Sequence, residues 1–210
     1  MADNWDSIVL ELKEQAQGMH DAREAVLVEC RMLGQLAAKS IRHVHRHQFN
    51  EAEALLEEAK VVAAKARELL RPHPELNPAY LHDTEKEMVE AAAVLSIVRG
   101  RPYPTVRELG AQVMSYLNGM GEAASEVRRF ALDEMRRGNI SEASAILSQM
   151  ETIYDDLITF DYADSMTGGL RRTCDSLRAV IERTRSDLTA TASQQELVKE
   201  LQAMRERLTL

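Results

Sequence analysis

The stretch EKEMVEAAAVLSIV, residues 85–98, predicts a helix that is apolar on almost every side. Hydrophobic and small side chains surround Glu90 within it, so this carboxylate has no polar helix face to share. A charged group in such surroundings must either shift its pKa or find a partner. The stretch therefore indicates a helix packed among apolar neighbours, and it singles out Glu90 as a candidate functional residue.

Composition favours one globular, helical domain spanning residues 1–210. The chain is 45% hydrophobic and 29% charged but only 4% aromatic, and Ala, Leu, Glu and Arg are abundant. Cys30 and Cys174 lack the spacing of a disulfide framework or a metal site, which favours reduced core thiols in a cytoplasmic protein. The acidic N-terminus is not typical of a signal peptide, and no apolar run approaches a membrane span. The formal net charge of −8 argues against binding nucleic acid through bulk charge, although a local basic surface is compatible with it.

Apolar periodicity and capping signals divide the chain into about seven predicted helices. They cover approximately residues 3–47 (one helix, or two joined near Gly18), 50–70, 78–98, 105–138, 139–160, 167–191 and 193–208. Predicted start signals are capping boxes at Asn50/Glu53, Thr105/Glu108 and Asn139/Glu142, and an N-cap at Asn77-Pro78. No strand-like alternation or internal repeat is present. The expected fold class is all-α, a seven-helix bundle of long antiparallel helices with short loops.

Two pairs of glutamates form the candidate catalytic and metal-binding site. Glu87 and Glu90 share one face of their helix, as do Glu122 and Glu126 on the next. Small residues at 119–125 allow a neighbouring backbone to come close, and the GRPYP turn predicts that the two helices are antiparallel neighbours. Facing carboxylates would repel one another unless a cation lay between them. Oxygen ligands without Cys or His suit Mg²⁺ or Mn²⁺, which activate water for phosphodiester cleavage.

Other interpretations of these residues remain open. The glutamate pairs are also compatible with ordinary solvated helix faces. A di-iron site normally needs Glu-x-x-His motifs, and no histidine of this chain lies three residues after a glutamate. His43 and His47 have a spacing that suits zinc, but no third ligand is evident, and the helix dipole alone favours cations at that helix end.

Arginines on the predicted 167–191 helix form the candidate nucleic-acid-binding group. Arg171 and Arg178 share one helix face, and Arg172 lies beside them. The planar guanidinium is well suited to phosphate oxygens, although a helix surface paired with neighbouring acids explains the same pattern. Aromatic residues are scarce, so RNA recognition is expected to use backbone and shape.

The order and spacing of four stretches resemble the translin family, and within it the catalytic translin-associated factor X type and its archaeal relatives. These are MHDAREAVLVECRML (19–33), EMVEAAAVLSIV (87–98), YLNGMGEAASEVRRFALDEMRRGNI (116–140) and LRRTCDSLRAVIERTRSDL (170–188). Together they extend over most of residues 18–190.

This resemblance implies a seven-helix fold that assembles into closed octameric shells enclosing RNA. It further implies a Mg²⁺-dependent endoribonuclease for single-stranded or imperfectly paired RNA. The family's acidic residues match Glu87, Glu90, Glu122 and Glu126 here, and Arg23 joins the three arginines as an RNA-binding candidate.

The family's non-catalytic translin type lacks the first glutamate pair, so this chain is similar to the active branch. It departs from the catalytic pattern at Glu122, where aspartate is usual. It also keeps only His82 and Lys86 of translin's basic segment, which weakens the expectation of DNA binding. The alternatives are a non-catalytic shell that binds RNA or single-stranded DNA, and a helical scaffold whose glutamates form structural ion pairs.

Overall fold

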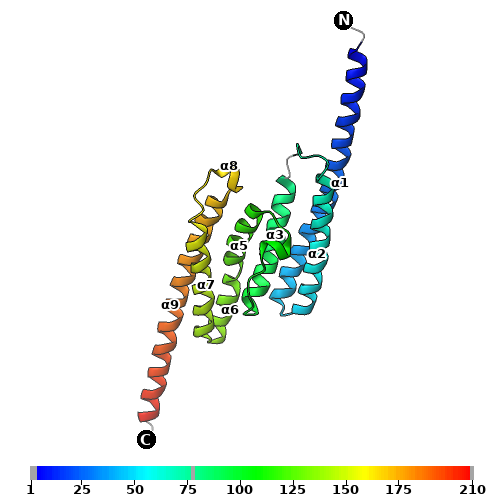
Figure 1. Cartoon of the computed structure of the whole chain (residues 1–210). Coiled ribbons are helices and arrows are strands. Elements are labelled where there is room, and N and C mark those ends of the chain that lie inside the picture. Colours follow the sequence, from blue (N-terminus) through cyan, green and yellow to red (C-terminus); the bar gives the residue numbers. More distant parts are fainter. Residues whose placement is uncertain (1–3, 77–78, 209–210) are drawn as a thin grey trace.

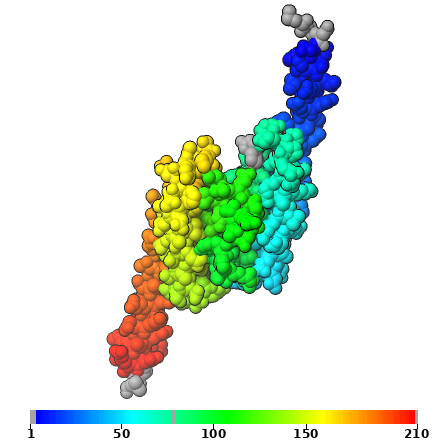
Figure 2. All heavy atoms as spheres, viewed as in Figure 1, coloured from blue at the N-terminus to red at the C-terminus, as the bar shows by residue number. Residues whose placement is uncertain are grey.

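The computed structural model describes residues 4–76 and 79–208, and these contain helices and no strand. The helices are α1 (Trp5–His45), α2 (Phe49–Leu70), α3 (Ala79–Val98), α4 (Val106–Leu109), α5 (Val113–Glu126), α6 (Arg128–Arg137), α7 (Ile140–Leu157), α8 (Asp164–Thr167) and α9 (Leu170–Leu208). Figure 1 shows α1 and α2 at one side of the molecule, α9 at the other, and α3 and α5 between them. The start of α1 and the end of α9 project in opposite directions (Figures 1 and 2). The all-α fold class is confirmed.

One main hydrophobic core holds the long helices together. It contains side chains of α1, α2, α3, α5, α7 and α9, and α3 contributes buried residues on nearly every side, as its sequence predicts. Removing this apolar surface from water is the main force that stabilises such a packing. Cys30 and Cys174 are both buried and free, as expected of core thiols. No helix in the described part of the chain is long and apolar enough to cross a membrane.

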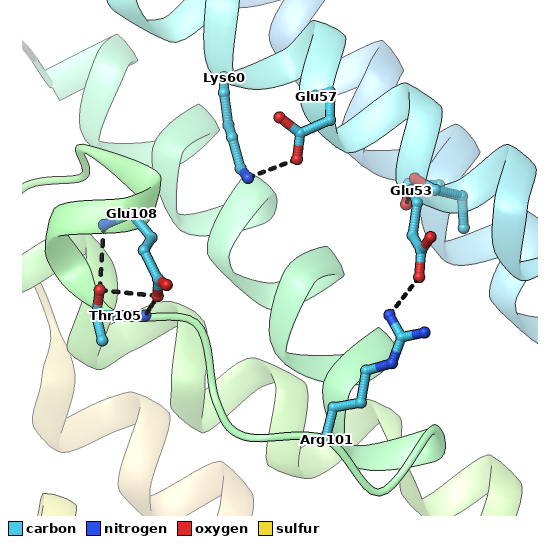
Figure 3. Close-up of polar contacts among 8 residues, drawn as sticks. Glu53, Glu57, Lys60, Arg101, Thr105 and Glu108 are labelled. Carbon is cyan, nitrogen blue, oxygen red and sulfur yellow. Dashed lines mark hydrogen bonds and ion pairs between the residues drawn. The ribbon is translucent and has the colours of Figure 1, made fainter.

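The predicted helix at 105–138 is three separate helices. The Thr105/Glu108 capping box is present: the Thr105 hydroxyl accepts from the Glu108 N–H at 3.1 Å, and the Glu108 carboxylate accepts from the Thr105 N–H at 2.7 Å (Figure 3). However, α4 ends after one turn because Gly110 adopts a left-handed conformation with φ of 61°. The chain then begins α5 at Val113, and a local break at Val127 separates α5 from α6.

Two other predicted capping boxes are wrong, although the helices begin within about one residue of the predicted positions. α2 begins at Phe49 without a side-chain cap, and Glu53 instead accepts hydrogen bonds from Arg101 at 2.6 Å and Arg99 at 3.1 Å (Figure 3 shows Arg101). Asn139 is the N-cap residue of α7 but makes no side-chain capping bond, and its side-chain amide donates to Glu134 at 2.6 Å. The predicted cap at Asn77-Pro78 lies outside the described residues.

Both terminal helices are longer than the predicted pieces. α1 runs unbroken through Gly18, and α9 joins the predicted helices at 167–191 and 193–208 into one of 39 residues. The hydroxyls of Thr189 and Thr191 bond to backbone carbonyls one turn earlier, at 2.8 Å and 2.7 Å, which is compatible with a continuing helix.

The helices α3 and α5 run parallel, and the predicted antiparallel arrangement of this pair is wrong. Near the start of α3, His82 is hydrogen bonded to Ser115 near the start of α5, and one turn later Lys86 pairs with Glu122. The connection through residues 99–112 returns along the bundle before α5 begins (Figure 1), and Arg101 anchors it to α2. Successive turns of α3 therefore lie beside successive turns of α5, which aligns their two glutamate pairs.

Candidate functional site

Two glycines of α5 bring its backbone close to both neighbouring helices. A Cβ on Gly119 would lie 2.6 Å from Val89 Cβ and 2.7 Å from the Lys86 carbonyl oxygen, both on α3. A Cβ on Gly121 would lie 2.6 Å from Cγ2 of Thr173 on α9. The predicted close approach at the small residues of α5 is confirmed, and it places Glu122 at a junction of three helices.

The four predicted glutamates interact electrostatically around Glu90. Burial, followed by repulsion from Glu122, Glu126 and Glu87, raises the pKa of Glu90 to about 8. Burial is also the main reason that the pKa of Glu87 is raised, with Glu122 adding to the effect. No hydrogen bond or ion pair to Glu90 occurs within residues 4–76 and 79–208. The structure thus brings the two predicted pairs together and leaves the most buried member without a partner.

Lys86 lies inside this acidic group and bonds to one of its members. Its Nζ donates to Oε1 of Glu122 at 2.8 Å, and both side chains are partly buried. Burial lowers the pKa of Lys86, but the Glu122 bond and the nearby carboxylates outweigh it and raise that pKa on balance. The lysine therefore stays charged and partly neutralises the site.

Glu126 has a different partner, the side chain of His45 from the last turn of α1. His45 Nε2 lies 2.6 Å from Glu126 Oε1, and its ring stacks on Phe130 at a centroid distance of 5.2 Å. Only 8% of the His45 side chain is exposed. Its ring is therefore held in place by packing, and it fixes the position of Glu126.

Glu87 lies against a glycine of α1. A Cβ on Gly34 would be only 3.0 Å from Oε2 of Glu87, so the absence of a side chain at this position leaves space for the carboxylate. Three helices, α1, α3 and α5, thus shape the surroundings of the glutamates.

The donor atoms of this group fit a hard divalent cation, because all four side chains offer carboxylate oxygen. Within residues 4–76 and 79–208, no three His, Cys, Asp or Glu side chains lie close enough together to hold a metal ion. Lys86 holds Glu122, and His45 holds Glu126. Binding of Mg²⁺ or Mn²⁺ would need these side chains to rotate, and the metal site stays a prediction.

Of the four predicted RNA-binding arginines, the structure places Arg172 beside the glutamates. Arg172 lines a recess of about 370 Å³ together with Lys86 and Glu122. Arg171 lines a different hollow of about 370 Å³ beside α7 and α8.

The other two arginines make their contacts elsewhere. Arg178 is exposed and pairs with Glu182 at 3.8 Å. Arg23 pairs with Glu24, and its guanidinium lies over the Tyr80 ring, 5.7 Å from the centroid.

Sequence reasoning missed Lys86, His45 and Gly34 as parts of this site. Lys86 had a usable signal, since it lies one turn before Glu90 on the same helix. His45 and Gly34 had none, because their roles depend on the packing of α1 against α5 and α3. His43 and His47 do not share a helix face, because α1 ends at His45 and His47 packs edge-on against Phe130.

Comparison with known proteins identifies the family. No family model matches the chain. The crystal structure of C3PO from Archaeoglobus and the structure of its complex with duplex RNA each match with a TM-score of 0.82 and 31% sequence identity, over 89% of this chain and 97% of that one. C3PO from Nematostella has the same fold, with a TM-score of 0.77 and 24% identity over 87% of this chain and 96% of that one. An uncharacterized protein of Methanocaldococcus jannaschii is 28% identical over 169 residues, which are 79% of this chain and 74% of that protein. C3PO proteins are of the translin/TRAX type, and this chain belongs to the translin family.

Proposed function

We propose that the protein is a metal-dependent endoribonuclease that cleaves single-stranded or imperfectly paired RNA. The observation that carries this proposal is Glu90, a mostly buried carboxylate with no hydrogen bond or ion pair in the described part of the chain. Its nearest charged neighbours include three further glutamates. A protein keeps such a costly arrangement where it serves a site. The likeness to an archaeal C3PO whose structure contains duplex RNA supports RNA as the substrate class.

The proposed metal ligands are all carboxylates. Glu87, Glu90, Glu122 and Glu126 would hold Mg²⁺ or Mn²⁺. The bound metal would lower the pKa of a water molecule and stabilise negative charge on the scissile phosphate. A carboxylate of this group that does not contact the metal would accept a proton from the attacking water. His45 would keep Glu126 in a fixed orientation through the bond to its Oε1.

Arg172 is the best placed of the proposed RNA-binding residues, because it lines the recess that Glu122 also lines. Its guanidinium would bind backbone phosphate oxygens. Arg23, Arg171 and Arg178 lie on other surfaces and would contact more distant parts of the RNA. Single-stranded DNA has the same backbone phosphates and is a secondary candidate ligand.

The proposed assembly is a closed homo-oligomer, with the octamer as the expected size. The projecting ends of α1 and α9 (Figures 1 and 2) carry exposed large apolar side chains: Trp5, Leu10, Leu12, Leu197, Leu201 and Met204. Such surfaces on both ends of one chain favour burial against other chains. Light scattering on the purified protein measures the mass of the assembly.

A cleavage assay tests the proposed activity. Wild type, Glu90→Gln and the control Glu57→Gln would be incubated with labelled single-stranded RNA in Mg²⁺, Mn²⁺ or EDTA. Glu57 is an exposed residue of α2 that pairs with Lys60 (Figure 3), so its loss should not change the rate. We expect metal-dependent cleavage that Glu90→Gln slows by at least about 100-fold, while RNA retention on a filter is kept. Cleavage by Glu90→Gln at the wild-type rate would refute the site.

The second candidate is a non-catalytic shell that binds RNA or single-stranded DNA. It is favoured by the contacts of Glu122 with Lys86 and of Glu126 with His45, which satisfy two of the four carboxylates without a metal. RNA retention without any product, in either metal, would support this binder over the nuclease. A purely structural scaffold predicts no RNA retention at all, and no change on replacing Arg172.

A further inference from the structure

A recess beside the glutamate group is lined by both cationic and anionic side chains. It has a volume of about 370 Å³ and lies between α3, α5 and α9. Its charged lining residues are Asp83, Lys86, Glu122 and Arg172, and its uncharged polar lining residues are Asn118, Ser125, Thr173 and Ser176. Lys86 and Glu122 belong both to this recess and to the proposed metal site, so the two sites share a wall.

Lys86 is the side chain that can move between these two sites. Its Nζ is 2.8 Å from Glu122 Oε1, and the side chain retains 23% exposure. Lysine carries its charge on a flexible four-carbon chain, so the ammonium can turn from one side of the shared wall to the other. The ion pair with Glu122 holds the Lys86 ammonium, whereas the His45 ring is held by its stack on Phe130.

A divalent cation and Lys86 compete for the same carboxylate. A metal ion held by Glu122 would lie close to the Lys86 ammonium in a partly buried site, where like charges repel strongly. His45 is instead held in place by its stack on Phe130, and its Nε2 contacts only Oε1 of Glu126, so the other oxygen of that carboxylate stays available. Of the two groups that hold the carboxylates, Lys86 is therefore the one that must leave.

With RNA in the recess, a backbone phosphate would be a second anionic partner for Lys86. Arg172 lines the same recess and has no ion pair or hydrogen bond from its side chain within the described ranges. Two cationic side chains that face one hollow match the several oxygens of a phosphodiester. The hydroxyl of Ser176 adds a further donor to this wall, whereas that of Ser125 already donates to the Gly121 carbonyl at 3.2 Å.

We propose that Lys86 is an exchangeable counter-ion: it leaves Glu122 when the metal binds and then holds, together with Arg172, a backbone phosphate of RNA in the recess. This proposal rests on the proposed nuclease site, since it needs a metal at Glu122. Without RNA, Lys86 opposes the metal. With RNA, it connects the two ligands, so that each tightens the binding of the other by the same factor.

The test measures binding and not turnover, on the full chain in its native assembly. Titration calorimetry would give the Mn²⁺ affinity of wild type and Lys86→Met without RNA. Fluorescence anisotropy would give the affinity of a 2′-O-methyl RNA oligonucleotide with and without Mn²⁺, with its integrity checked on a gel. The control is Lys60→Met, which removes a lysine paired with Glu57 at 2.7 Å on α2 (Figure 3).

Three results are expected. Lys86→Met binds Mn²⁺ about two- to fivefold more tightly than wild type in the absence of RNA, because a competing ion pair is gone. In wild type and Lys60→Met, Mn²⁺ tightens oligonucleotide binding by about fivefold or more, and in Lys86→Met by less than about twofold. Arg172→Met weakens binding of the oligonucleotide in Mn²⁺ but leaves the Mn²⁺ affinity of the RNA-free protein as in wild type, because Arg172 does not bond to Glu122.

The possible outcomes distinguish a failure of the role proposed for Lys86 from a failure of the proposed metal site. If Lys86→Met keeps both the wild-type Mn²⁺ affinity and the wild-type coupling to the oligonucleotide, the role of Lys86 is refuted and the metal site stands. If wild type binds no Mn²⁺, or Glu90→Gln binds it equally well, the metal site itself is refuted and the exchange with it. If Lys60→Met and Lys86→Met lose the coupling between Mn²⁺ and the oligonucleotide equally, the effect comes from the loss of one positive charge at any position, and the role assigned to Lys86 is overturned.

Discussion

Glu85 and Glu90 lie on the same helix, α3, yet their carboxylates have opposite surroundings. Glu85 is completely buried, and its oxygens accept hydrogen bonds from Arg67 of α2 and from the backbone N–H of Gln112 at 3.0 Å. Glu90 is largely buried too, but its charged surroundings are mostly other carboxylates, which together with burial raise its pKa to about 8.

Burial alone does not mark a functional carboxylate. A buried charge with a cation and an N–H donor is part of the architecture, because its desolvation is compensated. A buried carboxyl group that faces carboxylates makes folding less favourable where it must ionise, and its retention indicates a use outside the fold. Glu85 therefore joins α2, α3 and the segment before α5, whereas Glu90 is available to a ligand.

The largest expected effect comes from Glu85→Gln. It leaves the partly buried guanidinium of Arg67 without its counter-ion, and we expect the free energy of unfolding to fall by about 3 kcal/mol. The control is Glu53→Gln, whose more exposed carboxylate pairs with Arg101 (Figure 3) and whose loss should cost less than about 1 kcal/mol. Urea unfolding followed by circular dichroism measures both. Equal losses in the two variants would contradict a structural role for Glu85.

The next largest effect is expected from Gly119→Ala. The added Cβ would meet the Lys86 carbonyl oxygen at 2.7 Å, and backbone cannot move aside as a side-chain end can. Forcing α3 and α5 apart should lower the free energy of unfolding by about 2 kcal/mol and separate Glu122 from Glu90. Gly18→Ala is the matched control in α1: its nearest contact would be 3.8 Å away, so helix propensity should make it neutral or stabilising by up to about 1 kcal/mol. A stable Gly119→Ala with an unchanged Glu90 titration would show that the close approach is not needed.

The sequence predicted those parts of the site that depend on neighbours along the chain. Glu90 stood out because its own helix is apolar all round, and the Thr105/Glu108 capping box was found because all its atoms come from residues 105–108. Glu85 begins the same quoted stretch but was not recognised, since its partners come from α2 and from Gln112. Local spacing cannot show which distant cation will reach a buried acid.

The direction of α5 relative to α3 was predicted wrongly for the same reason. The GRPYP turn indicated an antiparallel pair, but the direction of α5 is set by the path of residues 99–112, which the contact between Arg101 and Glu53 holds against α2. In α9, which joins the last two predicted helices, the hydroxyls of Thr189 and Thr191 bond back to carbonyls of the same helix. Propensity could not decide between this use of threonine and a helix end.

A smaller and pH-dependent effect distinguishes Glu90 from Glu85. The pKa of Glu90 is about 8 in the folded protein against an ordinary value of 4.5. Between these values the folded state keeps a proton that the unfolded state has released. In EDTA, stability should therefore fall as pH rises from about 4.5 to about 8, by at most about 1.4 kcal/mol per unit.

Glu90→Gln should remove this part of the slope and be more stable than wild type by about 1–2 kcal/mol near pH 8, after allowing for solvent screening. Urea unfolding at several pH values measures the difference between the two proteins. Parallel stability profiles for wild type and Glu90→Gln would mean that Glu90 is not desolvated in the way its surroundings indicate.

Gly34→Ala should have the smallest effect on stability. Alanine favours a helix interior over glycine by about 1 kcal/mol, which opposes the crowding of a Cβ placed 3.0 Å from Glu87 Oε2. Because that oxygen is the end of a flexible side chain, Glu87 can rotate away, and the free energy of unfolding should change by less than about 1 kcal/mol. The rotation would nevertheless withdraw one carboxylate from the group around Glu90. We therefore expect Mn²⁺ affinity to fall severalfold while the unfolding curve stays close to wild type, the opposite of Glu85→Gln, which should lose stability and leave the carboxylate group in place. Calorimetric titration of Gly34→Ala with Mn²⁺ at wild-type affinity would show that Glu87 does not contribute to the site, and would reduce the group to Glu90, Glu122 and Glu126.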